Sequence, residues 1–252
     1  MATQKGIIKL KGTLGDITFY KSKDGYIARE KGGIDANRIA KDPAFQRTRE
    51  NGAEFGRAGK AGRILRTAFR PLLLNTSDAR MVSRLTQQFI RVIQADATNT
   101  RGLRNVMDGE TELLSGFEFN INGKLGTTFY APYTTSIDRI SGALAVSIPS
   151  FVPLNMVTAP SGTTHFKLLS GGVALDFESE TYTLATSESA LLAWDSTPTA
   201  VLDLTNTVTP NSTVPLFLAF GVAFYQEVNG ASYPLKNGFY NPLSLVQVDG
   251  GV

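Results

Sequence analysis

Eight short runs with β-strand character fill the chain from Glu112 onward, and no helical pattern separates them. Glycine, proline, asparagine and serine stand between the runs, as in Asn122-Gly123 and Gly171-Gly172. Short strands joined by turn residues without intervening helices pair in antiparallel fashion. The runs are 117–121, 143–148, 165–169, 173–177, 181–185, 200–204, 216–225 and 243–248. This part of the chain therefore predicts an antiparallel β-sandwich, Ig-like or jelly-roll-like, within an α+β chain.

The segment 34–110 has helical signals instead. Asp42-Pro43 is typical of a helix N-cap followed by proline in the first turn, and Arg70-Pro71 is where proline ends such a helix. Four glycines in it cost about 4 kcal/mol relative to alanine, but their spacing places them on one side, where another backbone could approach closely. They are Gly52, Gly56, Gly59 and Gly62. The alternative is that this segment is broken helix and loop.

A second helix is predicted from an Asp78 N-cap to about Ala95, followed by a polar connection over 98–109. Its apolar residues recur at helical spacing and define one face. They are Val82, Leu85, Phe89, Val92 and Ile93. An amphipathic helix of this kind packs its apolar face on a core.

The N-terminal residues 1–33 predict β-structure. The runs 17–21 and 26–29 flank Asp24-Gly25, a pair that suits a type I′ turn because both of its central positions need positive φ. In such a hairpin Ile17, Phe19 and Tyr26 share one face, and Tyr20 and Ile27 share the other. A small hairpin cannot bury two apolar faces by itself. The rest of the chain or another copy of it must therefore cover one of them.

Charge is divided sharply along the chain. Residues 1–110 hold 21 Lys and Arg against 11 Asp and Glu, a net charge of +10, and residues 111–252 hold 4 against 11, a net charge of −7. An uneven distribution of charge like this one indicates the kind of partner that each part of the chain binds, and does not indicate its fold. It suggests a basic assembly region at 1–110 and an acidic β-domain at 111–252.

The basic residues of the first predicted helix form a slowly winding stripe, and lysines add charge to the hairpin region. The stripe is Arg57, Lys60, Arg63, Arg66 and Arg70. Sequence-independent phosphate binding needs little more than such a surface, so a nucleic-acid partner is one interpretation. Asp42, Glu50 and Glu54 dilute the stripe, and the acidic part supplies a protein partner of opposite sign. A protein contact is therefore favoured.

Catalytic and metal-binding patterns are missing from the sequence. It has no cysteine and one histidine, His165, too few for a Ser-His-Asp arrangement or a usual zinc site. Asp176, Glu178 and Glu180 alternate as a pair of catalytic carboxylates might, but three like charges on a strand face are more typical of a solvated edge. We expect no enzymatic activity, no cofactor and no metal site.

The first eleven residues intersperse lysines in a short apolar run and do not resemble a secretory signal. The longest apolar stretch, 215–225, is about half the ~20 residues that cross a bilayer. We therefore expect synthesis in the cytoplasm and no membrane span, with a place in a phage-derived or released particle as an alternative.

Several segments resemble a family of uncharacterised bacterial proteins of the bacteroidete type. The N-terminal likeness lies in Gly12-Thr13-x-Gly15 with Thr18-Phe19-Tyr20, followed by Lys23-Asp24-Gly25-Tyr26 and Arg29-Glu30-Lys31-Gly32-Gly33. It continues in the segments 42–51, 54–56 and 225–230. The resemblance implies no activity and no site residues.

These patterns predict a non-enzymatic structural subunit that forms a homo-oligomer such as a tube, filament or shell through heterologous contacts. The predicted assembly interface is Ile17, Phe19, Tyr20, Tyr26, Ile27, Arg29, Gly52, Gly56, Gly59, Gly62, Arg63, Arg66 and Arg70. The alternative is a nucleic-acid-binding or packaging protein that uses the basic helices. A third interpretation, a carbohydrate- or ligand-binding β-domain, rests on fold analogy.

Overall fold

The computed structural model describes residues 2–23, 25–30, 32–76 and 78–251. Helices and strands both contribute, and all strand pairings among the described residues are antiparallel. The chain divides into two compact units, Met1–Glu50 and Asn51–Val252. This division lies within the helical segment, between residues 50 and 51, whereas the change of charge along the sequence lies near residue 110.

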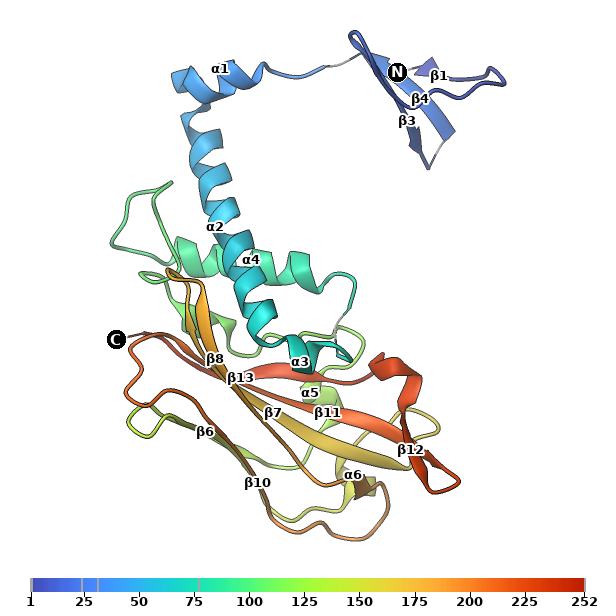
Figure 1. The fold of residues 1–252 in the computed structure, drawn as a ribbon, viewed down its shortest axis with the longest axis vertical. Coiled ribbons are helices and arrows are strands. Elements are labelled where there is room, and N and C mark those ends of the chain that lie inside the picture. The colour runs from blue at the N-terminus through green and yellow to red at the C-terminus, as the bar shows by residue number, and fades with distance from the viewer. Residues whose placement is uncertain (1, 24, 31, 77, 252) are drawn as a thin grey trace. The chain divides into compact units, whose positions relative to one another are not determined.

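The N-terminal unit contains a four-stranded sheet in the order β1-β4-β3-β2 (Figure 1). Its strands are β1 (Ala2–Thr3), β2 (Gly12–Leu14), β3 (Ile17–Ser22) and β4 (Gly25–Glu30). β3 and β4 pair as the predicted hairpin does, but Gly25 pairs with Ser22 and is the first residue of β4. Gly25 is thus part of a strand and not of the predicted Asp24-Gly25 turn. Gly25 has a φ of +107°, and Asp24 lies outside the described residues.

Two short helices follow the sheet, α1 (Ala36–Lys41) and the 3₁₀ helix η1 (Pro43–Phe45). The Asp42 carboxylate accepts a hydrogen bond from the Ala44 amide at 2.9 Å, and Pro43 takes the first helical position. The cap predicted at Asp42 therefore starts a 3₁₀ turn, and the regular helix α2 (Gln46–Ala68) begins four residues later. Proline at this position loses no hydrogen bond, because the first amides of a helix have no intrahelical partner.

Helices α2, α3 (Arg70–Leu73) and α4 (Met81–Gln94) lie on one face of the large sheet in the second unit (Figure 1). Pro71 stands in the first turn of α3, so the chain continues in helical form past the predicted stop. The Asp78 carboxylate accepts from the Arg80 amide at 2.6 Å, and α4 begins at Met81, three residues after the predicted cap. Val82, predicted on the apolar face of α4, is 46% exposed, and Met81 is buried instead.

The second unit contains two antiparallel sheets. In the larger, β12-β11-β7-β8 are neighbours, β13 also pairs with β11, and β9 with β7. The smaller has the order β10-β6-β5. The strands are β5 (Thr134–Asp138), β6 (Ala143–Ile148), β7 (His165–Asp176), β8 (Thr181–Glu188), β9 (Leu192–Ala193), β10 (Leu202–Thr207), β11 (Leu216–Val228), β12 (Ala231–Pro234) and β13 (Leu243–Asp249). Short helical turns complete the unit: η2 (Thr111–Leu114) and α5 (Leu125–Thr128) precede β5, α6 (Pro153–Met156) lies between β6 and β7, and η3 (Leu235–Gly238) lies between β12 and β13.

Alternate residues of the larger sheet enter two different hydrophobic cores. Phe217 and Val173 pack in one core with Leu65 and Phe89 of the helices. Their neighbours Leu216 and Leu218 pack in the other core with residues of the smaller sheet. Helices 51–94 and the β-rich segment are therefore parts of one unit, because the sheet buries one face on the helices.

Candidate functional site

The N-terminal sheet carries apolar side chains on both faces. Tyr20 pairs with Ile27, while Phe19 pairs with Ala28 and Lys21 with Tyr26. Paired residues of antiparallel strands point to the same side, so the structure separates Tyr20 and Ile27 from Phe19 and Tyr26 as predicted. Arg29 lies with Tyr20, its guanidinium 5.6 Å from the tyrosine ring centre.

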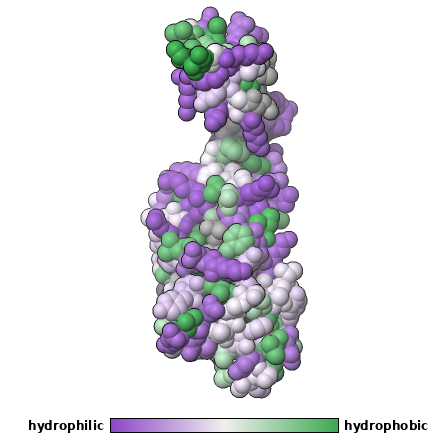
Figure 2. Space-filling model, turned by 90° about the vertical axis from the view of Figure 1, so that its right-hand side faces the viewer, coloured by the Kyte–Doolittle hydropathy of each residue, from purple (hydrophilic) through white to green (hydrophobic). Residues whose placement is uncertain are grey.

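No described residue of the segment 2–50 is buried. The Ile7 side chain is fully exposed, at 101%, Leu14 is 74% exposed, and Ile17 is 46% exposed. Figure 2 shows such apolar side chains at the surface of this unit, beside hydrophilic ones. A sheet needs a covered hydrophobic face for independent stability. The structure thus presents, within the described residues, a sheet without a hydrophobic core.

The four glycines of α2 differ in their surroundings. A Cβ added at Gly62 would touch Leu85 and Phe89, each at 3.6 Å, so this glycine accommodates α4 of the same chain. Added Cβ atoms at Gly52, Gly56 and Gly59 would meet no described atom within 4 Å. The glycine spacing predicts a close contact with another helix. At Gly62 that contact is made with α4 of the same chain, whereas the other three glycines have open space beside them.

The basic stripe of α2 is largely engaged within the chain. Lys60 and Arg63 both pair with Glu180, at 2.7 and 3.0 Å. Arg57 donates to the carbonyl oxygens of Gly102 and Arg104, each at 2.7 Å. Arg66 donates to a carbonyl of its own helix, and Arg70 is exposed. Among the described residues, the stripe thus meets the acidic segment through one carboxylate, that of Glu180.

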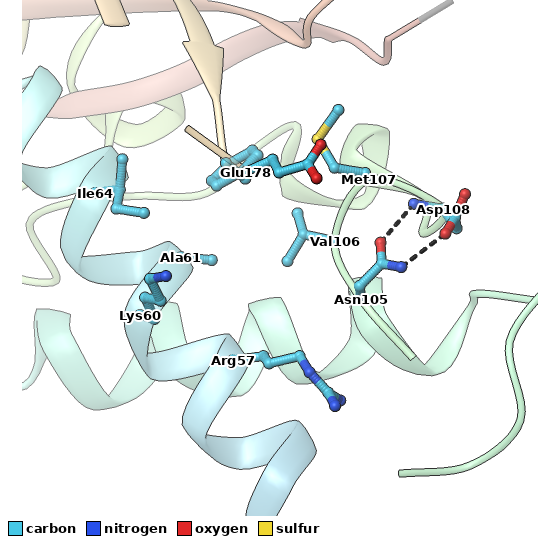
Figure 3. Close-up of a pocket in the computed structure, with 10 residues that line it drawn as sticks. Arg57, Lys60, Ala61, Ile64, Asn105, Val106, Met107, Asp108 and Glu178 are labelled. Carbon is cyan, nitrogen blue, oxygen red and sulfur yellow. Dashed lines mark hydrogen bonds between the residues drawn. The ribbon is translucent and has the colours of Figure 1, made fainter. Parts of the chain in front are cut away.

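A cleft of about 590 Å³ lies beside this stripe (Figure 3). Ala61 and Ile64 of α2 and Val106 of the loop after α4 line it with apolar surface, while charged groups of both signs surround them. Arg57 and Lys60 face it, as do Asp108 and Glu178. Arg57 already donates to backbone carbonyls, and Lys60 already pairs with a carboxylate. Among the described lining residues, no nucleophilic side chain lies next to a side chain that could act as its general base. The cleft can hold a ligand but shows no catalytic arrangement.

Asp176 and Glu180, two of the three carboxylates of the 176–180 turn, have structural partners. Asp176 accepts hydrogen bonds from the amides of Glu178 and Ser179 and from the Ser179 hydroxyl, which lowers the pKa of its carboxyl. His165 Nε2 lies 3.5 Å from a carboxylate oxygen of Glu227. Within the described part of the chain, no three His, Asp or Glu residues are grouped to hold a metal ion. Nor is any helix in that part long and apolar enough to cross a membrane.

Glu118 is an unusual carboxylate that the sequence did not point to. One carboxylate oxygen accepts from the Leu125 amide at 3.0 Å, and the other is buried without a partner among the described residues. Burial raises the pKa of Glu118 to about 7, although the Leu125 hydrogen bond and the charges of Lys124 and Arg84 act in the opposite direction. In the sequence, the phenylalanines on either side of Glu118 are the signal that indicates its burial.

Replacing Glu118 by glutamine is expected to stabilise the protein at about pH 8 by about 1 kcal/mol, an amount limited by solvent screening. The unfolded carboxyl ionises near its ordinary pKa of 4.5, before the folded one does, so stability falls as the pH rises towards 7. The variant should lack this decline in urea unfolding, whereas Glu110→Gln, at an exposed position, should keep it. Equal pH dependence in Glu118→Gln and the parent protein would contradict the prediction.

No protein-family model matches the chain, and no curated protein matches it. Functional inference therefore rests on the arrangement of its residues.

Proposed function

We propose that the chain is a non-enzymatic structural subunit that self-assembles into a homo-oligomer through its N-terminal sheet. The observation that carries the proposal is the lack of any buried described residue in the segment 2–50, although both faces of the sheet bear apolar side chains. A second copy is the partner that every such protein has available. Covering one face, or extending the edge strand β1 or β2, would bury this surface.

Charge supports a heterologous contact. The segment 1–50 holds 11 Lys and Arg against 6 Asp and Glu, a net charge of +5, and residues 111–252 have a net charge of −7. Because Lys60 and Arg63 are paired within their own chain, the cations of the N-terminal sheet are the better candidates for meeting a neighbour's acidic surface. A contact between two different surfaces closes into a ring or continues as a tube or filament.

In this proposal the unit 51–252 is the body of the subunit, its two sheets forming a β-sandwich of Ig-like or jelly-roll-like type, and the N-terminal unit is the connector. The packaging alternative would need free cations on α2, and the contacts of Arg57, Lys60 and Arg63 reduce their number. The resemblance to uncharacterised bacterial proteins remains a prediction that adds no activity.

Sedimentation velocity tests the proposal. The full-length protein should form species larger than a monomer as its concentration rises, and less so at high salt, because surface charges are screened beyond a Debye length of about 8 Å at physiological salt. The double variant Ile17→Lys, Phe19→Lys should associate at least about tenfold more weakly. Ile140→Lys, the same change at an exposed position of the second unit, is the matched control. A protein that stays monomeric at high concentration and low salt would refute self-assembly.

A further inference from the structure

The loop containing η3 is held in a backbone conformation that most residues avoid. Lys236, Asn237 and Gly238 have φ values of 47°, 50° and 74° in succession. Non-glycine residues in this left-handed region cost about 1 kcal/mol or more each and persist only where surrounding contacts fix them. Something in the fold therefore maintains this loop against its local preference.

Two buried asparagines supply that support. Asn120 Nδ2 donates to the carbonyl oxygens of Phe239 and Asn241, each at 2.9 Å. Asn241 in turn donates to the Asn75 carbonyl at 3.2 Å and accepts from the Phe224 amide at 3.1 Å. Fully paired buried amides fix a loop rigidly, because breaking any one of these bonds leaves a buried polar group unsatisfied.

This rigid loop exposes two aromatic side chains to solvent. Phe239 and Tyr240 are 52% and 38% exposed, and their rings meet edge to face with centres 4.8 Å apart. Lys236 Nζ lies 5.1 Å from the centre of the Tyr240 ring. Exposed aromatic rings on a rigid support are a typical means of recognition, since little side-chain entropy is lost when a ligand stacks on them.

A groove of about 400 Å³ runs beside Tyr240. Phe224, 1% exposed, contributes to its lining, and Asn122, Thr158 and Ser161 contribute polar side chains. None of these three side chains has a hydrogen-bond partner among the described residues. Lys236 is the one charged residue of the lining. The groove thus combines an aromatic ring with uncharged donors and acceptors.

We propose that this groove binds a neutral sugar unit, which stacks on the Tyr240 ring and exchanges hydrogen bonds with Asn122, Thr158 and Ser161. A sugar ring has an apolar C–H face for the aromatic ring and hydroxyl groups around its rim for amide and hydroxyl partners. Uncharged lining groups favour such a ligand over a phosphate or carboxylate compound, which would need several cations. This site is separate from the N-terminal sheet and does not depend on self-assembly.

Saturation-transfer difference NMR with full-length protein tests the site, because it observes the small ligand and tolerates an assembled protein. The probes are the methyl glycosides of glucose, galactose, mannose and N-acetylglucosamine. At least one should bind with a dissociation constant of about 1–10 mM. Tyr240→Ala should weaken that binding at least about tenfold, and Thr158→Val, which keeps the side-chain shape and removes the hydroxyl, by about threefold or more.

Tyr182→Ala is the matched control, because Tyr182 is a 45% exposed tyrosine on β8 outside the groove, and its variant should bind like the parent protein. Unchanged thermal unfolding in Thr158→Val would separate a lost contact from lost structure. Absence of binding by all four glycosides would overturn the proposal, as would equal binding in Tyr240→Ala. Adenosine monophosphate is added as a further probe, and Tyr240-dependent binding of this nucleotide alone would also overturn it.

Discussion

Phe217→Ala is expected to reduce the free energy of unfolding by about 3–5 kcal/mol, as removal of a fully buried phenylalanine ring does. Phe217 lies on β11, is fully buried, and faces the core shared with the helices. Its ring meets Phe177 edge to face at 6.1 Å, and Phe177 meets Phe89 of α4 at 5.7 Å. These three rings join the large sheet to α4.

The loss should extend to helices and sheets together, since they share this core. Circular dichroism at the helical band and fluorescence of Trp194, the single tryptophan, which packs in the other core, report on different layers. Both should show one coincident unfolding transition in the parent protein and in the variant. Phe55→Ala, at a 60% exposed phenylalanine of α2, should change stability by about 0.5 kcal/mol or less. Separate transitions would show that the helices fold independently of the sheet.

Glycines show both the reach and the limit of sequence reasoning. The pair Gly171-Gly172 predicts a break between two strands, but both residues lie inside the continuous strand β7. A Cβ at Gly171 would come within 2.5 Å of Leu72, and one at Gly172 within 2.9 Å of Asn206. Because these two glycines have no side chain, α3 and β10 can approach the two faces of the sheet closely. Only the tertiary arrangement distinguishes this use from a turn.

The predicted strand 117–121 is wrong for a related reason. Its apolar alternation is genuine, since Phe119 is buried, but only Glu118 forms an isolated bridge, with Ser244 of β13. Phe119 also donates its amide to the Leu243 carbonyl at 2.8 Å. The Gly116 amide also donates to the Leu245 carbonyl at 2.7 Å, and the Leu245 amide donates to the Phe117 carbonyl at 3.0 Å, so the segment pairs with β13 over residues 116–119 instead of over 117–121. Local periodicity indicates that this segment is buried, but it does not indicate how far the segment follows β13.

The polar connection expected at 98–109 turns out to be tightly organised around Asp96. This carboxylate is 4% exposed and accepts four hydrogen bonds. The donors are the amides of Thr98, Asn99 and Asn105 and the Asn99 side chain, at 2.8 to 3.0 Å. A sequence rich in polar residues predicts a loop. It does not reveal that a single aspartate accepts hydrogen bonds from so many donors of that loop. The cleft beside α2 depends on this loop, because Asn105 and Val106 line it.

Asp96→Ala is expected to destabilise the second unit by about 3 kcal/mol, because several partly buried donors lose a charged acceptor at once. Asp195→Ala is the matched control, since Asp195 is exposed and its side chain accepts one hydrogen bond among the described residues, from the Thr197 amide at 2.8 Å; the change should cost about 1 kcal/mol or less. Urea unfolding measures both. A loss for Asp96→Ala no larger than for the control would show that the loop does not depend on the carboxylate.

The pH dependence tests the same arrangement in the intact protein. Burial acts to raise the pKa of Asp96, but the hydrogen bonds from Asn99, Asn105 and Thr98 outweigh it and lower the pKa from 3.8 to about 2. The unfolded carboxyl therefore takes up its proton first, so the stabilisation is complete above about pH 5 and is lost as the pH falls towards 2. In Asp96→Asn, which cannot ionise, this part of the acid destabilisation should be missing. The decisive measurement is the slope of unfolding free energy against pH between about pH 5 and 3, which should be shallower in Asp96→Asn than in the parent protein.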